Sequence, residues 1–183
     1  MKVLGLSGSL RAGSHNSKLL RAAADLLPPE CELVEFDLLK AIPPYDEDHD
    51  HDRPHAVRAL HEAIAEADAV LVATPEYNHS IPGQLKNALD WISRPLADSP
   101  LRNKPTAVVG ASTGLFGAVW AQAEARKVLS AIGARVIDRE LPVAMADDAF
   151  TVDGALVDED LALALGGILA ELVGETRPVA LAA

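Results

Sequence analysis

The sequence predicts an α/β protein built on an open, doubly wound parallel sheet. Short apolar runs alternate along the 183-residue chain with longer segments whose apolar residues recur at helical spacing. The run at residues 69–73 is apolar throughout, as expected of a central parallel strand buried on both faces. Right-handed crossovers favour a five-stranded sheet of order 2-1-3-4-5 with helices on both faces, and a ligand site beyond the carboxyl ends of the first and third strands.

Five segments are predicted as strands. They are, in chain order, residues 2–7, 32–37, 69–73, 106–111 and 135–137. The first is a short apolar run that glycine and serine end, whereas the second alternates polar and apolar residues, which is typical of a strand near the sheet edge. The fourth is a second buried run, and the fifth is short.

Five segments have the apolar spacing of amphipathic helices. They are residues 16–27, 54–67, 83–92, 118–132 and a last helix with Leu161, Leu165, Ile168 and Leu172 on one face. Pro28 stops the first helix, Pro54 suits the first turn of the second, and Gly133 ends the fourth as a left-handed cap.

Composition limits the function classes. A formal net charge of −11 disfavours partners such as nucleic acid or an anionic membrane. The single cysteine, Cys31, excludes an intrachain disulfide and fits a reducing compartment. No apolar segment reaches the roughly 20 residues of a membrane-spanning helix, and no export signal is visible. We expect a soluble, cytoplasmic protein with one domain over residues 1–176 and a flexible tail over residues 177–183.

The loop after the first predicted strand suits a phosphate. Residues 8–17 are rich in glycine and hydroxyl groups and lead directly into a helix, whose first N–H groups are unpaired and carry partial positive charge. Ser9, Ser14 and Asn16 add hydrogen-bond donors, and Arg11 adds charge. The alternative is that Ser14, Asn16 or Ser17 only caps the helix.

Known nucleotide motifs narrow the ligand. Gly8 and Gly13 have the spacing of a triphosphate-binding loop, but Ser14-His15 stands where that motif requires lysine followed by serine or threonine. The same loop does not match the G-x-G-x-x-G pattern of dinucleotide-binding proteins. Because the loop matches neither the triphosphate motif nor the dinucleotide motif, a mononucleotide is the nucleotide ligand that we predict.

The loop after the third strand carries the most specific motif, Pro75-Glu76-Tyr77-Asn78. Together with Gly8-Ser9-Leu10-Arg11, Ser14 and Asn16, it resembles the NADPH-dependent FMN reductase family, which includes bacterial quinone, chromate and azo-dye reductases. The resemblance spans nearly the whole chain. It implies a flavodoxin-like fold, with the first loop on the FMN phosphate and the Pro-Glu-Tyr-Asn turn against the flavin ring.

The resemblance also implies which residues bind the cofactor. They are Ser9, Arg11, Ser14, His15 and Asn16 in the first loop, Pro75, Glu76, Tyr77 and Asn78 in the second, and Ser112, Thr113 and Gly114 in the third. Phe116 and Trp120 border either the nicotinamide or acceptor site, the core, or a subunit contact. Lys86, Asn87 and Trp91 are interpreted as structural residues of their helix.

One further cluster resembles a metal site. Residues 46–55 alternate aspartate and histidine, the residue types that bind metals. Such a run is more often a solvated acidic loop, because a metal needs ligands that converge in space. We therefore predict no metal.

These features predict an FMN-dependent NAD(P)H oxidoreductase. NADPH or NADH would pass hydride to the bound flavin, and a small acceptor (a quinone, azo compound, chromate or free flavin) would then take the electrons. Because the cofactor performs the chemistry, no catalytic acid or base is nominated. The alternatives are a non-enzymatic flavodoxin-like electron carrier with an acidic docking surface, and a scaffold that has lost its ligand. The resemblance further implies a homodimer or homotetramer.

Overall fold

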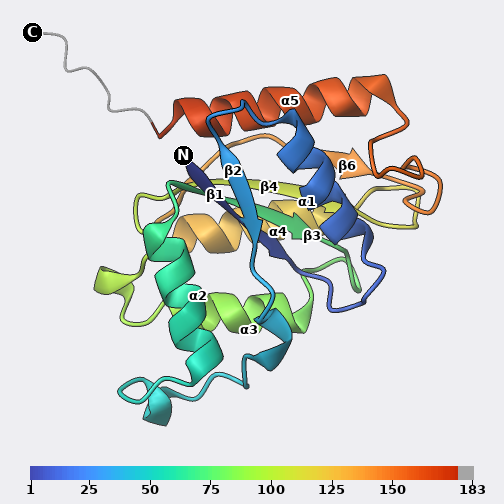
Figure 1. Cartoon of the computed structure of the whole chain (residues 1–183). Helices are drawn as coiled ribbons and strands as arrows, with labels where there is room; N and C mark the ends of the chain where they lie inside the picture. Colours follow the sequence, from blue (N-terminus) through green and yellow to red (C-terminus); the bar gives the residue numbers. More distant parts are fainter. Residues whose placement is uncertain (177–183) are drawn as a thin grey trace, which may run out of the picture.

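The computed structural model describes residues 1–176 and shows a parallel sheet between two layers of helices (Figure 1). The strand order is β2-β1-β3-β4-β5, and every pairing is parallel, which confirms the predicted topology. The strands are β1 (Lys2–Ser7), β2 (Glu32–Glu35), β3 (Ala69–Thr74), β4 (Pro105–Ala111), β5 (Arg135–Val136) and β6 (Pro142–Val143). The predicted tail at residues 177–183 lies outside the described residues.

The outer position beside β4 is divided between two short strands, where the sequence predicts one. β5 pairs with the first two residues of β4, and β6 pairs with its last two. Between them the chain leaves the sheet over residues 138–140, where Arg126 pairs with Asp138 and Glu140. The buried side chain of Gln122 then accepts a hydrogen bond from Leu141 N at 2.9 Å, which brings the chain back to the edge.

Helices cover both faces of the sheet. On one face lie α1 (His15–Leu26) and α5 (Glu159–Gly174), and on the other lie α2 (His55–Glu66), α3 (Gly83–Ile92) and α4 (Val119–Ile132). Short 3-10 turns are η1 (Leu39–Ala41), η2 (Glu47–His49) and η3 (Leu96–Asp98). Gly133 ends α4 with a φ of 101°, which confirms the predicted left-handed cap.

The core consists of two apolar layers that share β3. Val70 and Val72 pack against the layer of α2, α3 and α4, whereas Leu71 packs against α1 and α5. All six residues of β3 are buried, because successive side chains of a strand point to opposite faces and both faces are covered. The prediction of a central strand is therefore confirmed.

Candidate functional site

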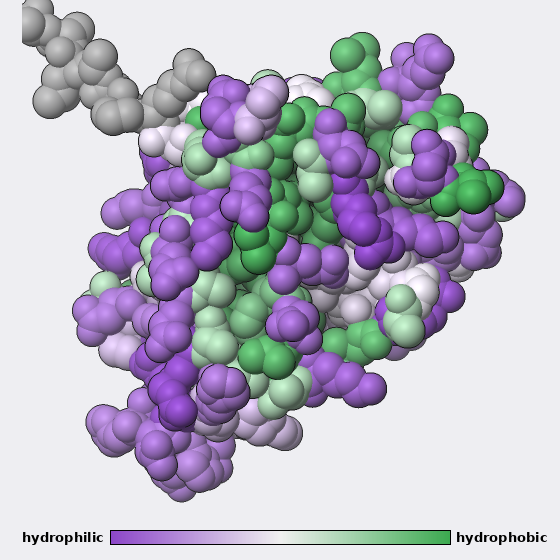
Figure 2. All heavy atoms as spheres, in the orientation of Figure 1, coloured by the Kyte–Doolittle hydropathy of each residue, from purple (hydrophilic) through white to green (hydrophobic). Residues whose placement is uncertain are grey.

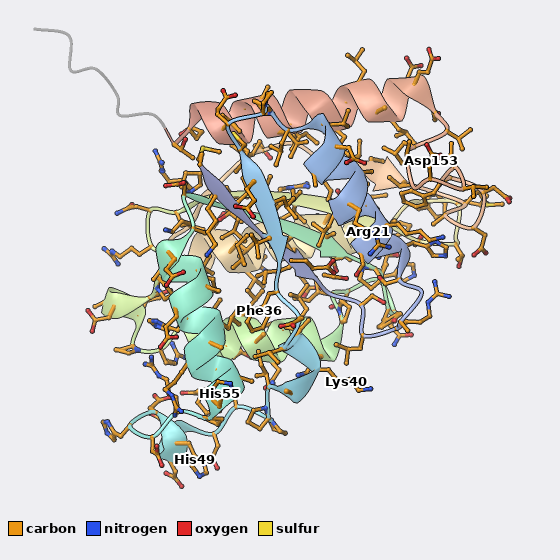
Figure 3. All side chains as sticks on the ribbon, in the orientation of Figure 1. Arg21, Phe36, Lys40, His49, His55 and Asp153 are labelled. Atoms are coloured by element: carbon orange, nitrogen blue, oxygen red, sulfur yellow. The ribbon has the colours of Figure 1, made fainter. Side chains whose placement is uncertain are left out.

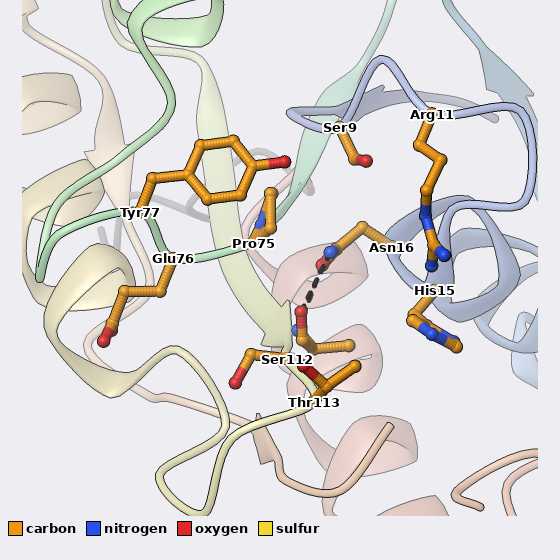
Figure 4. Close-up of a pocket in the computed structure, with 10 residues that line it drawn as sticks. Ser9, Arg11, His15, Asn16, Pro75, Glu76, Tyr77, Ser112 and Thr113 are labelled. Carbon is orange, nitrogen blue, oxygen red and sulfur yellow. Dashed lines mark hydrogen bonds between the residues drawn. The ribbon is translucent and has the colours of Figure 1, made fainter. Parts of the chain in front are cut away.

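A cavity of about 250 Å³ lies where the loops after β1, β3 and β4 meet (Figure 4). Its walls are formed by Ser9, Arg11, His15, Asn16, Pro75, Glu76, Tyr77, Ala111, Ser112 and Thr113. Nine of these are among the twelve residues predicted to bind the cofactor. The other three predicted residues, Ser14, Asn78 and Gly114, do not line the cavity. The topology thus brings all three predicted loops to one edge of the sheet.

Asn16 ties the first loop to the end of β4. Its side-chain amide donates to Ala111 O and accepts from Ala111 N, both at 3.0 Å (Figure 4). Asn16 is buried, so both hydrogen bonds are shielded from water. This pair fixes the spacing between two walls of the cavity.

Ser14 is the N-cap of α1. Its hydroxyl oxygen accepts hydrogen bonds from the backbone N–H groups of Asn16 at 3.1 Å and Ser17 at 3.2 Å. This is the capping role that the sequence left open as the alternative. The buried Ser14 side chain therefore shapes the start of the helix rather than the cavity wall.

The first loop presents unpaired donors. Within residues 1–176, the backbone N–H groups of residues 9–15 donate to no other group. Arg11 lines the cavity and takes part in no ion pair within the same range. Free N–H groups before a helix, together with an unpaired guanidinium, match the donor set that binds a phosphate.

The second loop is a tight hairpin turn. Tyr77 and Ser80 exchange backbone hydrogen bonds of 3.0 and 3.1 Å. The two residues between them, Asn78 and His79, have φ values of 54° and 60°, the left-handed pair of a type I′ turn. Asn78 is consequently at the exposed tip of the turn, while Tyr77 lies on the cavity wall.

Glu76 anchors this turn to α4. One of its carboxylate oxygens accepts hydrogen bonds from Trp120 N and Ala121 N, both at 3.1 Å, at the start of the helix. The side chain points away from Ser9 and Asn16 across the cavity (Figure 4). A carboxylate is stabilised at a helix N-terminus, so Glu76 holds the second loop against the start of α4.

The third loop is supported by the segment that follows β6, which the sequence analysis did not include. Ser112 O accepts from Ala146 N, and Gly114 O accepts from Met145 N, both at 3.1 Å. Gly117 has a φ of 57°, and a Cβ there would lie 2.7 Å from Pro142 O. Glycine is required at this position because no side chain fits against β6.

The same segment reaches His15. The imidazole Nε2 lies 3.1 Å from Asp147 Oδ1, and the ring stacks on Phe150 with centroids 6.2 Å apart. Asp147 is 132 positions from His15, so no local pattern in the sequence indicates this contact. Asp147 and Phe150 therefore hold the ring of His15 from a segment outside the three predicted loops.

The neighbouring aromatic residues divide into exposed and structural groups. Phe116 and Trp120 are 60% and 40% exposed and touch each other edge to face. In α3, by contrast, Trp91 is buried and donates to Pro43 O at 2.9 Å, while Asn87 also bonds Pro43 O. Lys86 pairs within its helix. Asn87 and Trp91 thus hold α3 against Pro43, and the interpretation of Lys86, Asn87 and Trp91 as structural residues stays a prediction.

The Asp/His-rich segment, residues 46–55, lies at the lower end of the molecule, where Figure 3 labels His49 and His55 and Figure 2 shows a hydrophilic surface. Asp46 accepts a hydrogen bond from Asp48 N at 3.0 Å. Among residues 1–176, no three His, Cys, Asp or Glu side chains gather as a metal would require. Over the same residues, no helix is both long and apolar enough to cross a lipid bilayer.

Comparisons with known proteins agree with this geometry. The model of the NADPH-dependent FMN reductase family matches residues 1–148. An NAD(P)H-dependent FMN reductase of Pseudomonas aeruginosa is 44% identical over 161 residues, which cover 87% of this chain and 86% of the relative. A quinone reductase of Escherichia coli K12 is 40% identical over 141 residues, which cover 76% of this chain and 74% of the relative.

The chain is also similar in structure to a solved flavoenzyme. FerB, a flavoenzyme NAD(P)H:(acceptor) oxidoreductase of Paracoccus denitrificans, is 35% identical, with a TM-score of 0.84 and 96% of each chain covered. The predicted class, an enzyme that uses FMN with NADPH or NADH, is confirmed, and the electron-carrier alternative is not supported. The loop motifs, the sheet order and the extent of these matches together show that the chain belongs to the NADPH-dependent FMN reductase family.

Proposed function

We propose that the cavity at the carboxyl edge of the sheet binds FMN. The observation that carries this proposal is the free backbone N–H groups of residues 9–15 beside the unpaired Arg11. A phosphate at this place would gain several hydrogen bonds and an ion pair without displacing any contact within residues 1–176. Ser9 adds a hydroxyl on the same wall.

We assign the flavin ring to the space bordered by the second and third loops. Pro75 and the hydrogen-bonded turn after it restrict the backbone, so N–H groups there would hold fixed positions toward the ring. Ser112 and Thr113 border the opposite side. When bound, FMN supplies the hydride chemistry, accepting from NADPH or NADH and delivering to an acceptor. The chain supplies binding and orientation, and we assign no acid or base to it.

A quinone is the acceptor class that we propose first. Tyr77 places an exposed aromatic ring on the cavity wall, which suits a planar substrate. The E. coli relative is a quinone reductase. Azo compounds, chromate and free flavin are the alternatives, and steady-state rates with each acceptor at equal NADPH concentration would rank them.

We also propose a cytoplasmic location, one domain over residues 1–176, and a homodimer or homotetramer. The exposed side chains of Leu115, Phe116 and Trp120 near the third loop support a subunit contact. Light scattering of the purified protein measures the mass. A monomer at micromolar concentration would contradict the assembly proposal.

The visible spectrum tests the central proposal. The purified full-length protein should show the two absorption bands of flavin or acquire them when FMN is added. Under anaerobic conditions, NADPH or NADH should bleach these bands, and a quinone should restore them. A colourless protein that does not bind added FMN would instead support the scaffold that has lost its ligand.

A further inference from the structure

A second cavity lies beside the first one, on the β2 side of the first loop. Its volume is about 200 Å³. Ser9 and Arg11 line both cavities, so the first loop forms the wall between them. The rest of the second cavity's wall comes from the carboxyl ends of β1 and β2 and from η1. The function proposed above does not use this cavity.

Two cations on its wall have no acidic partner. Arg11 and Lys40 take part in no ion pair in the part of the chain that the structure describes. Of the two carboxylates on the same wall, Glu35 already accepts a hydrogen bond from Ser17 Oγ at 2.6 Å, whereas Asp37 is exposed. The cavity therefore offers two uncompensated positive charges and one uncommitted carboxylate.

The turn that carries Lys40 is tied to the helix that follows the second loop. Gln84, in the first turn of α3, donates from Nε2 to Leu39 O at 2.7 Å and to Ile42 O at 2.8 Å. These two acceptors lie at the two ends of η1. Figure 3 labels Phe36, just after β2, and Lys40 in this turn. The backbone at Lys40 is consequently fixed relative to the loops of the first cavity.

The strand order predicts which part of a dinucleotide reaches the second cavity. This step rests on the proposed function, which places the flavin ring at the second and third loops and the FMN phosphate at the first. Neighbouring strands are about 4.8 Å apart, and β2 lies one position beyond β1. A dinucleotide whose nicotinamide stacks on the ring, and which runs parallel to FMN, carries its second nucleoside past the FMN phosphate. Its adenosine end would then lie at the second cavity.

Charge disfavours the opposite direction. The segment that supports the third loop carries Asp147 and Asp148, both of them exposed. Their carboxylates would repel the diphosphate of a dinucleotide, whereas Arg11 on the β2 side would attract it.

We propose that the second cavity is the subsite for the phosphorylated adenosine end of NADPH, and that Lys40 distinguishes NADPH from NADH. The two nucleotides differ only in the 2′-phosphate, which Lys40 and Arg11 would bind. Asp37 would accept a hydrogen bond from the adjacent ribose hydroxyl. Leu10, which is 43% exposed, and the half-buried Phe36 give adenine an apolar surface. A carboxylate alone would favour the 2′-hydroxyl of NADH, but two cations outweigh one carboxylate.

Binding of adenosine 2′,5′-bisphosphate tests the subsite without turnover. This probe has the phosphorylated adenosine end of NADPH and no nicotinamide, and 5′-AMP is the matched probe without the 2′-phosphate. Calorimetry on the full-length, FMN-loaded wild type should show at least about tenfold tighter binding of the bisphosphate than of 5′-AMP. Lys40→Ala should lose most of this difference, and Lys40→Arg should keep it.

Steady-state kinetics test the same residue with the complete nucleotides. In Lys40→Ala, kcat/KM for NADPH should fall about tenfold through a higher KM, because the contact is remote from the nicotinamide. The value for NADH should fall much less, since NADH has no 2′-phosphate. Lys127→Ala removes an exposed lysine of α4 outside both cavities and should keep the wild-type ratio of the two values. Circular dichroism checks that each variant is folded.

The outcomes distinguish this inference from the function on which it rests. Equal binding of the two probes to the wild type, or an unchanged ratio of NADPH to NADH turnover in Lys40→Ala, would overturn the subsite alone. A wild type that prefers NADH would also overturn it, because Asp37 would then decide the preference. Weaker FMN binding in Lys40→Ala would place Lys40 at the FMN phosphate instead. A protein that binds no FMN would end the proposed function, and this inference with it.

Discussion

The side chain of Asn16 and the backbone of Ala111 form a closed pair of hydrogen bonds, each 3.0 Å long, across 95 positions of sequence. Asn16 belongs to the first turn of α1, and Ala111 is the last residue of β4. The pair therefore joins the predicted phosphate side of the cavity to the third loop, and both bonds are buried. The shape of the cavity depends on it.

Asn16→Ala should lower both stability and flavin affinity. The substitution leaves the N–H and C=O of Ala111 buried without partners, which costs about 2–4 kcal/mol. Asn87→Ala is the matched control, since Asn87 also makes two side-chain bonds to backbone, at Pro43 O and Tyr45 N, but lies outside the cavity. Urea unfolding should show losses in both variants, whereas an FMN titration should show a loss of about tenfold or more only for Asn16→Ala.

Arg11→Ala should weaken FMN binding more than it affects folding. The guanidinium is exposed and makes no ion pair within residues 1–176, so its removal should change stability by less than about 0.5 kcal/mol. Loss of a charged phosphate contact should lower FMN affinity about tenfold or more. Arg21→Ala, on the exposed face of α1, should change neither property. An unchanged FMN affinity in Arg11→Ala would refute the assigned contact.

Glu76→Ala should loosen the second loop. The carboxylate accepts from two N–H groups at the start of α4, and removing such a cap costs about 1 kcal/mol. Flavin affinity should fall too, because the turn at residues 75–78 loses its anchor. Glu76→Gln should retain part of the stability and part of the flavin affinity. Asp158→Ala, which removes the cap of α5, should lower the melting temperature without weakening flavin binding. Equal flavin affinity in both alanine variants would show that the anchor has no effect on the site.

Gly117→Ala should destabilise the sheet edge. The position has positive φ, and the added Cβ would lie within 2.7 Å of both Pro142 O and Val143 N. We expect a loss of at least about 2 kcal/mol, because the backbone of β6 has to move. Gly114→Ala in the same loop has open space, with Ser112 Oγ 3.7 Å away, and should cost less than about 0.5 kcal/mol. Thermal unfolding measures the loss of stability in each variant, and the loss in Gly117→Ala should be the larger one.

His61 should make stability depend on pH. Burial, reinforced by the positive charge of Arg53, lowers the pKa of His61 below its usual 6.5. The unfolded chain then binds the proton more tightly than the folded chain, so this residue reduces stability as the pH falls below about 6.5. Urea midpoints between pH 5 and 7.5 should vary less for His61→Leu than for wild type. His51→Leu, an exposed histidine in the loop at residues 46–55, should keep the wild-type slope.

The central part of the fold was predictable because its signals are local. The apolar run at residues 69–73 has the pattern of a central strand, and Pro28, Pro54 and Gly133 lie within two residues of the helix ends that they indicate. Once the strand order followed, the three unusual loops had to meet at the carboxyl edge. Nine predicted residues consequently line one cavity, although their contacts with a cofactor stay a prediction.

The remaining features depend on contacts between distant residues. β6 has only two residues, too few for any periodicity, and its place is set by Gln122 and by the absence of a side chain at Gly117. The carboxylate of Glu76 meets the start of α4 some 44 positions away. The partner of His15 is Asp147, which lies 132 positions away in a segment without a recognisable motif. None of these contacts has a signature in its own stretch of chain.

The orientation of Glu76 affects how charged molecules reach the cavity. Its carboxylate is engaged by α4, so Arg11 is the lining residue with an uncompensated formal charge, in a protein whose net charge is −11. At physiological ionic strength, electric fields decay over about 8 Å, and the many distant carboxylates are screened more strongly than a guanidinium at the entrance. For an anion that approaches this opening, Arg11 therefore supplies a local attraction in a protein that is acidic as a whole.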